Sequence, residues 1–201
     1  MTERPNAPAT DRNREAILEV LVDEFSDRHE VLEIGSGTGQ HAVFFANAMS
    51  QLTWQTSDVA ANHSGIRSWL EFSKIDNVKP PLELDVESAT GIDGNFDAVY
   101  SSNTAHIMSM HAVECMFELV GNLLPVNGKF CLYGPFNRNG DFTSESNARF
   151  DASLRSQEPS MGIRNLEDLE LLAEKARMQR RSIYAMPANN FMVAWNRAGT
   201  R

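Results

Sequence analysis

The stretch VLEIGSGTGQHAVFFA, residues 31–46, decides the fold of this chain. It begins as a short apolar run that ends in glycines, which is typical of a buried strand over about 30–35. From Gly39 to Met49 the apolar residues recur at helical spacing. Between strand and helix the backbone has to turn sharply and lie open to a ligand, and residues without Cβ allow both. The segment therefore predicts a strand, a glycine loop and a helix whose N-terminus faces the ligand crevice of an open α/β sheet.

The same alternation of strands and helices continues along the chain. A helix is expected ahead of the loop, over about 10–26. Further strands are predicted at 52–57, 82–86, 96–102 and 129–134, and further helices at 62–74, 110–124 and 166–178. The last two strands, 182–186 and 191–195, are so close in sequence that they have to pair antiparallel. The prediction is an α/β fold: a Rossmann-like sheet of parallel strands with a C-terminal antiparallel hairpin strand and helices on both faces.

The length of 201 residues fits one domain with a sizeable core. Residues 1–9 are polar and proline-rich, so we expect a flexible N-terminal arm there and a single domain over 10–201. Residues 137–165 are polar, bear glycine and are too long for an ordinary connection. They predict a polar insertion with a functional role.

Composition limits the partners of the chain. A net charge of −9 without a long basic run argues against nucleic acid as the primary partner. No apolar run approaches the roughly 20 residues of a membrane span, and the first residues do not resemble a signal peptide. Cys115 and Cys131 have neither metal-ligand spacing nor a disulfide framework. We therefore expect a cytoplasmic protein with no membrane association and no metal site, of unknown oligomeric state.

The glycine turn alone is ambiguous, because structural glycine turns between a strand and a helix are common. Two further features favour a cofactor site. Glu33 is charged in an otherwise apolar strand, and because a buried carboxylate is costly without a partner, we expect one. The acid-x-G-x-G-x-G spacing of Glu33, Gly35, Gly37 and Gly39 also differs from the G-x-G-x-x-G of dinucleotide binders. In this context it resembles the first motif of class I methyltransferases, which use S-adenosyl-L-methionine.

That resemblance implies how the cofactor is held. Its methionine part would lie over the glycine loop, where Gln40 and His41 open the following helix. Asp58, at the end of the second strand, would accept both ribose hydroxyls, or else cap the next helix. Asp85, followed by Val86, would lie near the adenine amine, with a helix cap again as the alternative.

Several short motifs resemble a narrower family, the one that includes methyltransferase-like protein 26. They are GTGQH (37–41), YGPF (133–136), SNARFD (146–151), GIR (162–164) and MPANN (186–190). The family implies the methyltransferase fold and S-adenosylmethionine binding, and brings no known substrate. This chain departs from the family pattern at Thr104, Ser109 and Met110, where a methionine and a proline-tryptophan pair are expected. The departure concerns the mouth of the substrate site and leaves the cofactor loop unaffected.

Residues after the fourth strand of such enzymes usually face the transferred methyl group. Asn103 and His106 lie there, and a histidine can take a proton from a hydroxyl or amine at neutral pH. Asn103 is therefore a candidate for the cofactor site and His106 for the catalytic base. The alternative is that His106 is a packed structural residue.

Candidates for substrate binding come from the polar motifs: Asn147, Arg164, Asn189 and Asn190. Their place in loops favours a polar lid above the methyl group. Arg164 would suit a carboxylate or phosphate on the substrate. Asparagine also favours turns without any ligand, so turn chemistry is the alternative.

These features favour methyl transfer from S-adenosyl-L-methionine to a small-molecule acceptor. The chain has no Asn-Pro-Pro-Tyr run after the fourth strand and no Pro-Cys pair, which points away from DNA bases as acceptors. One alternative is a non-catalytic protein that keeps the cofactor pocket as a scaffold. The other is a nicotinamide-dependent oxidoreductase, which the glycine spacing disfavours.

Overall fold

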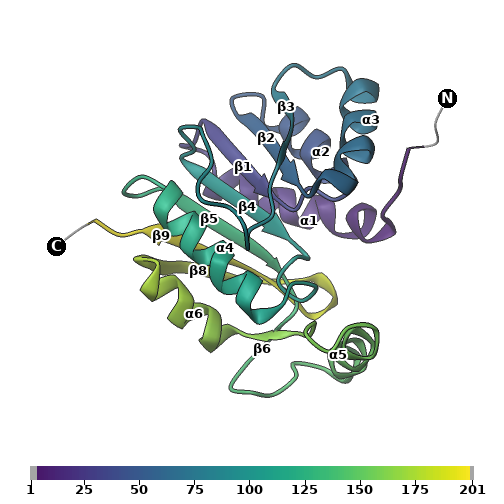
Figure 1. The fold of residues 1–201 in the computed structure, drawn as a ribbon, viewed down its shortest axis with the longest axis vertical. Helices are drawn as coiled ribbons and strands as arrows, with labels where there is room; N and C mark the ends of the chain where they lie inside the picture. The colour runs from purple at the N-terminus through teal and green to yellow at the C-terminus, as the bar shows by residue number, and fades with distance from the viewer. Residues whose placement is uncertain (1–3, 200–201) are drawn as a thin grey trace.

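The computed structural model describes residues 4–199 and has a seven-stranded sheet at its centre (Figure 1). The strands, in the order they occupy in the sheet, are β3 (Val78–Glu83), β2 (Thr53–Asp58), β1 (Glu30–Ile34), β4 (Ala98–Ser102), β5 (Lys129–Gly134), β9 (Asn190–Arg197) and β8 (Met178–Met186). The first five are parallel to one another, and β9 is antiparallel to both β5 and β8. The predicted sheet with its C-terminal antiparallel hairpin is confirmed.

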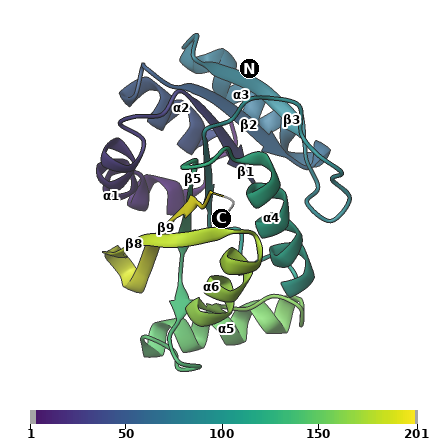
Figure 2. The same ribbon diagram turned by 90° about the vertical axis from the view of Figure 1, so that its left-hand side faces the viewer.

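Helices cover both faces of the sheet (Figures 1 and 2). One face carries α1 (Pro8–Glu24), α2 (Gln40–Ala48) and α3 (His63–Ser73), and the other carries α4 (Met110–Leu123) and α6 (Leu166–Lys175). Each face has its own hydrophobic cluster, with Trp54 fully buried in the first and Trp195 in the second. Two apolar layers around one sheet are what a fold of alternating strands and helices requires.

The strand predicted at 82–86 begins earlier, and both Pro80 and Pro81 lie inside β3. β3 is an edge strand that pairs only with β2, and its register shifts between Gln55 and Ser57. Proline has no N–H to donate, but an edge strand with an irregular register tolerates it.

The first helix also begins earlier than predicted, at Pro8. Proline suits this position because it lacks an N–H, and an N–H in the first turn would have no partner within the helix. Of the expected arm at 1–9, residues 1–3 lie outside the described residues. Residues 4–7 are not helical, and residues 8–9 are the start of α1. No helix within residues 4–199 combines the length and the apolar character that crossing a bilayer requires.

The insertion contains secondary structure that the sequence analysis did not predict. Its ends form a small sheet of β6 (Phe136–Asn137) and β7 (Arg164–Asn165), with α5 (Glu145–Gln157) between them. The residues that α5 buries are Asn147, Asp151 and Leu154. Two of the three are polar, so the buried face leaves no apolar period in the sequence.

Candidate functional site

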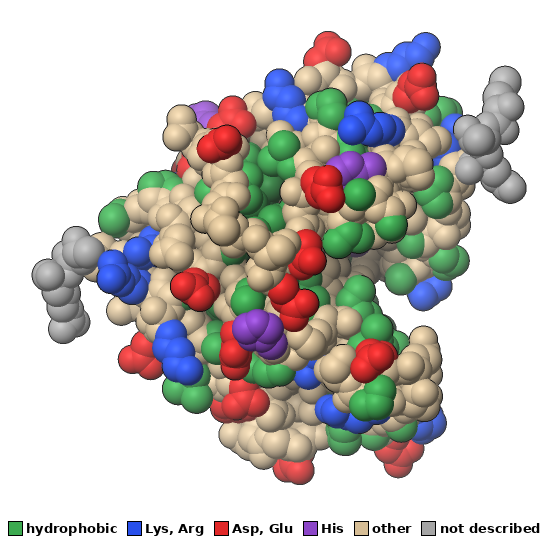
Figure 3. Space-filling view, viewed as in Figure 1, with side chains coloured by type: hydrophobic (Ala, Val, Ile, Leu, Met, Phe, Trp, Pro, Cys, Tyr) green, Lys and Arg blue, Asp and Glu red, His purple; other side chains and the backbone are tan. Residues whose placement is uncertain are grey.

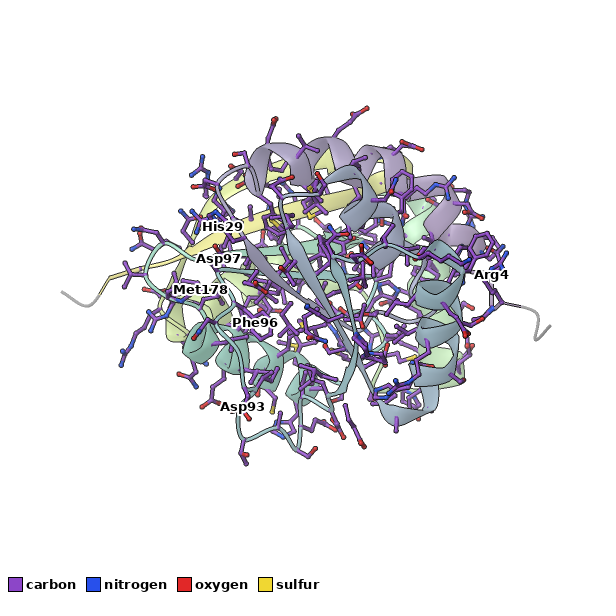
Figure 4. All side chains as sticks on the ribbon, turned by 90° about the horizontal axis from the view of Figure 1, so that it is seen from above. Arg4, His29, Asp93, Phe96, Asp97 and Met178 are labelled. Carbon is purple, nitrogen blue, oxygen red and sulfur yellow. The ribbon has the colours of Figure 1, made fainter. Side chains whose placement is uncertain are left out.

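The glycine loop lies at the carboxyl ends of the parallel strands. His29 and Asp97 precede β1 and β4 and mark the other ends of these strands. Figure 4 places both far from Arg4, which lies near the loop's end of the sheet. The loop is anchored to β2, because the N–H groups of Gly35 and Ser36 each donate to the Ser57 carbonyl over 3.0 Å.

The three loop glycines have left-handed backbone conformations, but for different reasons. A Cβ on Gly39 would lie 2.9 Å from the Cα of Ile66, so this glycine lets α2 and α3 approach each other. A Cβ on Gly35 would lie 2.5 Å from Cγ2 of Thr104. A Cβ on Gly37 would meet no described atom within 4 Å. Gly37 therefore faces open space, as a glycine that makes room for a ligand would.

Two cavities meet at this loop, and Gly35 lines both. The first, of about 450 Å³, lies over the loop and includes Gly37, His41 and Asn103 in its wall. The second, of about 290 Å³, lies beside it and is lined by the residues Ile34, Asp58, Asp85, Val86 and Met108, among others. Together they form a crevice with two unlike halves: the wall of the second cavity carries the carboxylates of Asp58 and Asp85, and the described wall of the first carries none.

Asp58 supports the loop and also lines the second cavity. Its Oδ2 accepts from the N–H of Gly37 over 2.7 Å. Its Oδ1 accepts from the N–H of Val59 (2.8 Å) and the amide of Asn62 (2.9 Å). Since a carboxylate oxygen can accept two hydrogen bonds, Oδ2 retains a site for a ligand.

Glu33 lies beneath the loop, only 1% exposed, and lines neither cavity. Its Oε2 accepts from the indole N–H of Trp54 over 3.2 Å, which supplies the partner expected for this carboxyl group. Burial raises the pKa of Glu33 to about 7. Its direct contacts are with the protein, so the structure places it as a support of the loop.

Gln40 and His41 begin α2 and have different surroundings. The amide of Gln40 binds the segment before α1, accepting from the N–H of Ala7 (2.6 Å) and donating to Asn6 (2.8 Å). His41 lines the first cavity, with its ring stacked on Phe45. Burial lowers the pKa of His41 to about 4, so the ring is neutral at neutral pH.

The segment before α1 is a wall of the first cavity that the sequence analysis missed. Pro5 and Ala7 belong to the lining, together with Thr10 in the first turn of α1. The indole N–H of Trp69 in α3 donates to the Pro5 carbonyl over 2.8 Å. The guanidinium of Arg4 lies 3.5 Å from the ring centre of Phe72, also in α3. These contacts hold residues 4–7 against the two helices that flank the loop.

The other predicted cofactor residues lie at the ends of β3 and β4. Asp85 and Val86 line the second cavity, and Oδ1 of Asp85 accepts from the N–H of Glu87 over 3.0 Å. Asn103 lines the first cavity in a left-handed conformation, with φ of +57°. Asparagine is one of the non-glycine residues that adopt this conformation most readily.

His106 follows β4 and packs against α5. It is 6% exposed, and its ring contacts the edge of Phe150 with the ring centres 5.2 Å apart. Its Nδ1 is buried without a hydrogen-bond partner among the described residues. Burial lowers the pKa of His106 to about 4, so a neutral imidazole with an unpaired nitrogen lies here. His106 lines neither of the two cavities.

The motifs SNARFD and MPANN come together, as a shared polar site requires. The amide of Asn147 donates to the Asn189 carbonyl over 3.2 Å, and the amide of Asn189 lies 3.4 Å from Oγ of Ser146. Asn190 follows them and donates to the Pro187 carbonyl over 3.1 Å. The surface is hollowed between α5 and the part of the molecule that carries the loop (Figure 3).

Arg164 does not take the expected place on a substrate. Its Nε donates to the Ala105 carbonyl over 2.9 Å, and its Nη2 donates to the carbonyls of Ser160 (2.9 Å) and Met108. The side chain is 9% exposed. Its guanidinium therefore holds the segment that carries His106 against the insertion.

Solved structures with a similar fold include the O-methyltransferase family 2 protein from Planctomyces limnophilus DSM 3776, in complex with apigenin. It is 14% identical at a TM-score of 0.83, over 96% of this chain and 58% of that one. The S-adenosylmethionine-dependent methyltransferase SibL, in its apo form, is 18% identical at a TM-score of 0.80, over 95% of this chain and 56% of that one. This chain thus spans little more than half the length of these structures. The likeness shows a Rossmann-like methyltransferase fold.

Among curated proteins, the non-reducing polyketide synthase ausA of Aspergillus calidoustus is 28% identical over 144 residues. The match covers 63% of this chain and 6% of that protein. The model of a family described as "Protein of unknown function (DUF938)" matches residues 4–197, nearly the whole chain. The chain therefore belongs to the DUF938 family.

Proposed function

We propose that this protein is an S-adenosylmethionine-dependent methyltransferase that acts on a small-molecule acceptor. The observation that carries the proposal is the open space at Gly37, in a loop where two cavities meet. A crevice of two unlike halves suits a ligand that joins an amino acid to a nucleoside. The folds of SibL and of human N-acetylserotonin methyltransferase, the latter in complex with S-adenosylmethionine, support it.

The residues present fit this cofactor. Gly37, His41 and Asn103 would surround its amino-acid half. Asp58 would accept a ribose hydroxyl at the free site on Oδ2, while Asp85, exposed in the second cavity, would lie by the adenine. When bound, S-adenosylmethionine supplies a methyl group to a nucleophile by in-line displacement. The protein's contribution to such a step is largely positioning.

The proposed base is His106. A neutral imidazole whose Nδ1 has no protein partner can take a proton from an acceptor hydroxyl or amine. Phe150, 40% exposed beside the imidazole ring, offers an apolar surface to the acceptor. The neighbouring structures named as O-methyltransferases favour a hydroxyl as the accepting group. Asn147, Asn189 and Asn190 would line the far side of the acceptor site.

A second candidate function is a non-catalytic S-adenosylmethionine-binding scaffold. It is favoured by the burial of the His106 ring beneath Phe150, because the ring reaches neither cavity in this conformation. The closer kinship with methyltransferase-like protein 26 also belongs to the proposal and rests on the sequence motifs. A cytoplasmic location belongs to it too and rests on the composition of the chain.

The test is methyl transfer from labelled S-adenosylmethionine to a panel of hydroxylated small molecules. We expect His106→Gln to lower kcat by about 100-fold or more, the usual scale for a general base, with unchanged binding of S-adenosylhomocysteine. His111→Gln, an exposed histidine on α4, is the matched control and should behave as wild type. Cofactor binding without transfer to any acceptor would favour the scaffold, and full activity of His106→Gln would exclude His106 as the base.

A further inference from the structure

A line of hydrogen bonds between uncharged side chains leads from α1 to the first cavity. Oδ1 of Asn13 lies 2.9 Å from Nε2 of His41, and Nδ1 of His41 lies 3.1 Å from Oγ of Ser102. Asn13 and His41 are buried. His41 and Ser102 both belong to the cavity wall.

The chemistry of Asn13 sets the direction of these bonds. Its amide oxygen can only accept, so Nε2 of His41 carries the proton. Its amide nitrogen is then free to bond Tyr133: burial raises the pKa of Tyr133, and a hydrogen bond from Asn13 offsets part of that rise. Because the buried His41 ring is neutral, Nδ1 has no proton and accepts the hydroxyl proton of Ser102.

The result is a fixed polarity at the cavity wall. Since the proton of Ser102 is directed at His41, its oxygen presents only lone pairs to the cavity. No Asp, Glu, Lys or Arg occurs among the described residues that line this cavity. A ligand ammonium group would therefore find acceptor oxygens there, and no carboxylate.

We propose that Asn13 is a positioning residue that, through His41, makes Ser102 an acceptor for the ammonium group of the cofactor's amino-acid half. This inference rests on the proposed function. Replacing Asn13 by leucine removes the acceptor at Nε2, so the His41 ring is no longer held in one tautomer. Ser102 can then turn its proton to the ligand and lose the ammonium contact.

Two measurements test this proposal on the full chain. The first is the ¹⁵N NMR spectrum of the His41 ring, where we expect the Nε2–H tautomer in wild type and its loss in Asn13→Leu. The second is calorimetric titration with S-adenosylhomocysteine and with its analogue lacking the amino group. Asn13→Leu should bind S-adenosylhomocysteine about tenfold to a hundredfold more weakly, the scale of a hydrogen bond to a charged group, and bind the analogue as wild type does.

Three further variants provide controls. Asn13→Asp keeps an acceptor oxygen and should restore both the tautomer and the preference for the amino group. Ser102→Ala should lose the same preference, with no further loss when combined with Asn13→Leu. Arg12→Leu changes the exposed neighbour of Asn13 and should change neither measurement.

The outcomes separate this inference from the function it rests on. Equal weakening of both ligands by Asn13→Leu, or an Nδ1–H tautomer in wild type, would overturn the positioning role alone. If Asn13→Leu fails to fold, Ser102→Ala decides, because an unchanged preference for the amino group in that variant also overturns it. If the wild-type protein binds neither S-adenosylhomocysteine nor the analogue, both the proposed function and this inference fail.

Discussion

The glycine loop at 35–39 and the insertion at 137–165 both follow the carboxyl end of a strand, yet they are held in place differently. The loop is fixed mainly through its backbone to the next strand along the chain, because the N–H groups of Gly35 and Ser36 donate to the Ser57 carbonyl and that of Gly37 donates to Asp58. The insertion is fixed by distant partners. Arg164 binds carbonyls 56 and 59 residues away, and Asn147 binds one 42 residues away.

The difference separates a segment that depends on its backbone conformation from one that depends on buried side-chain contacts. A loop that depends on backbone conformation reveals itself through glycine spacing, because only certain residues adopt those dihedral angles. A segment that depends on buried polar pairs reveals little, since its partners lie elsewhere in the sequence. We therefore expect a substitution at Gly37, the open position of the loop, to act on ligand binding, and a substitution at Arg164 in the insertion to act on stability.

The largest expected effect is at Gly37. Gly37→Val should abolish binding of S-adenosylhomocysteine, because the new side chain fills the open space over the loop. The positive φ should cost only about 1–2 kcal/mol of stability. Gly39→Val is the matched control, because its Cβ meets the backbone of Ile66 and should cost about 3 kcal/mol in folding instead. Calorimetry measures the affinity for S-adenosylhomocysteine, and urea unfolding measures the stability. An undiminished affinity in Gly37→Val would mean that the loop does not bind the cofactor.

The insertion should respond in the opposite way. Arg164→Met leaves three carbonyls without their donor, so we expect it to lower the free energy of unfolding by about 3–5 kcal/mol. Arg149→Met, an exposed position on α5, should change it by less than about 0.5 kcal/mol. Denaturant unfolding of the two variants is the measurement. If the Arg164→Met protein is stable and binds S-adenosylhomocysteine normally but has lost turnover, Arg164 binds the substrate instead.

The pH dependence of stability tests the support beneath the loop. The pKa of Glu33 is about 7 when folded, above its ordinary 4.5, so the folded state holds this proton more tightly than the unfolded chain. Stability should therefore fall as pH rises from about 4.5 to about 7, by about 3 kcal/mol at most. Glu33→Gln keeps an acceptor for Trp54 and should remove that fall. Urea unfolding at both ends of this pH range measures it, and an unchanged pH dependence in the variant would mean that Glu33 does not hold the proton.

The smallest effect is expected at Asp58. Asp58→Ala should weaken S-adenosylhomocysteine binding by about 1–3 kcal/mol, the scale of hydrogen bonds to a charged group. Because the carboxylate also accepts from the N–H groups of Gly37 and Val59, we expect a similar loss of stability. Titration calorimetry and thermal melting separate the two. A lower Tm with unchanged affinity would mean that Asp58 supports the loop and does not bind the cofactor.

The sequence predicts the fold and the loop side of the candidate site. The strand at 129–134 and the antiparallel C-terminal hairpin follow from apolar runs bounded by turn residues. The sequence does not predict the helix α5, because the buried face of this helix bears the polar residues Asn147 and Asp151. The cavity wall at residues 4–10 is also not predicted, because a polar, proline-rich segment suggests a flexible arm until its partners in α2 and α3 are known.

The cofactor specificity of the crevice is tested most directly by a pair of calorimetric titrations of the wild-type protein, one with S-adenosylhomocysteine and one with NAD. We expect one site for S-adenosylhomocysteine and no binding of NAD, because the loop has its open position at Gly37 in an acid-x-G-x-G-x-G spacing. Binding of NAD but not of S-adenosylhomocysteine would contradict the proposed function and favour an oxidoreductase.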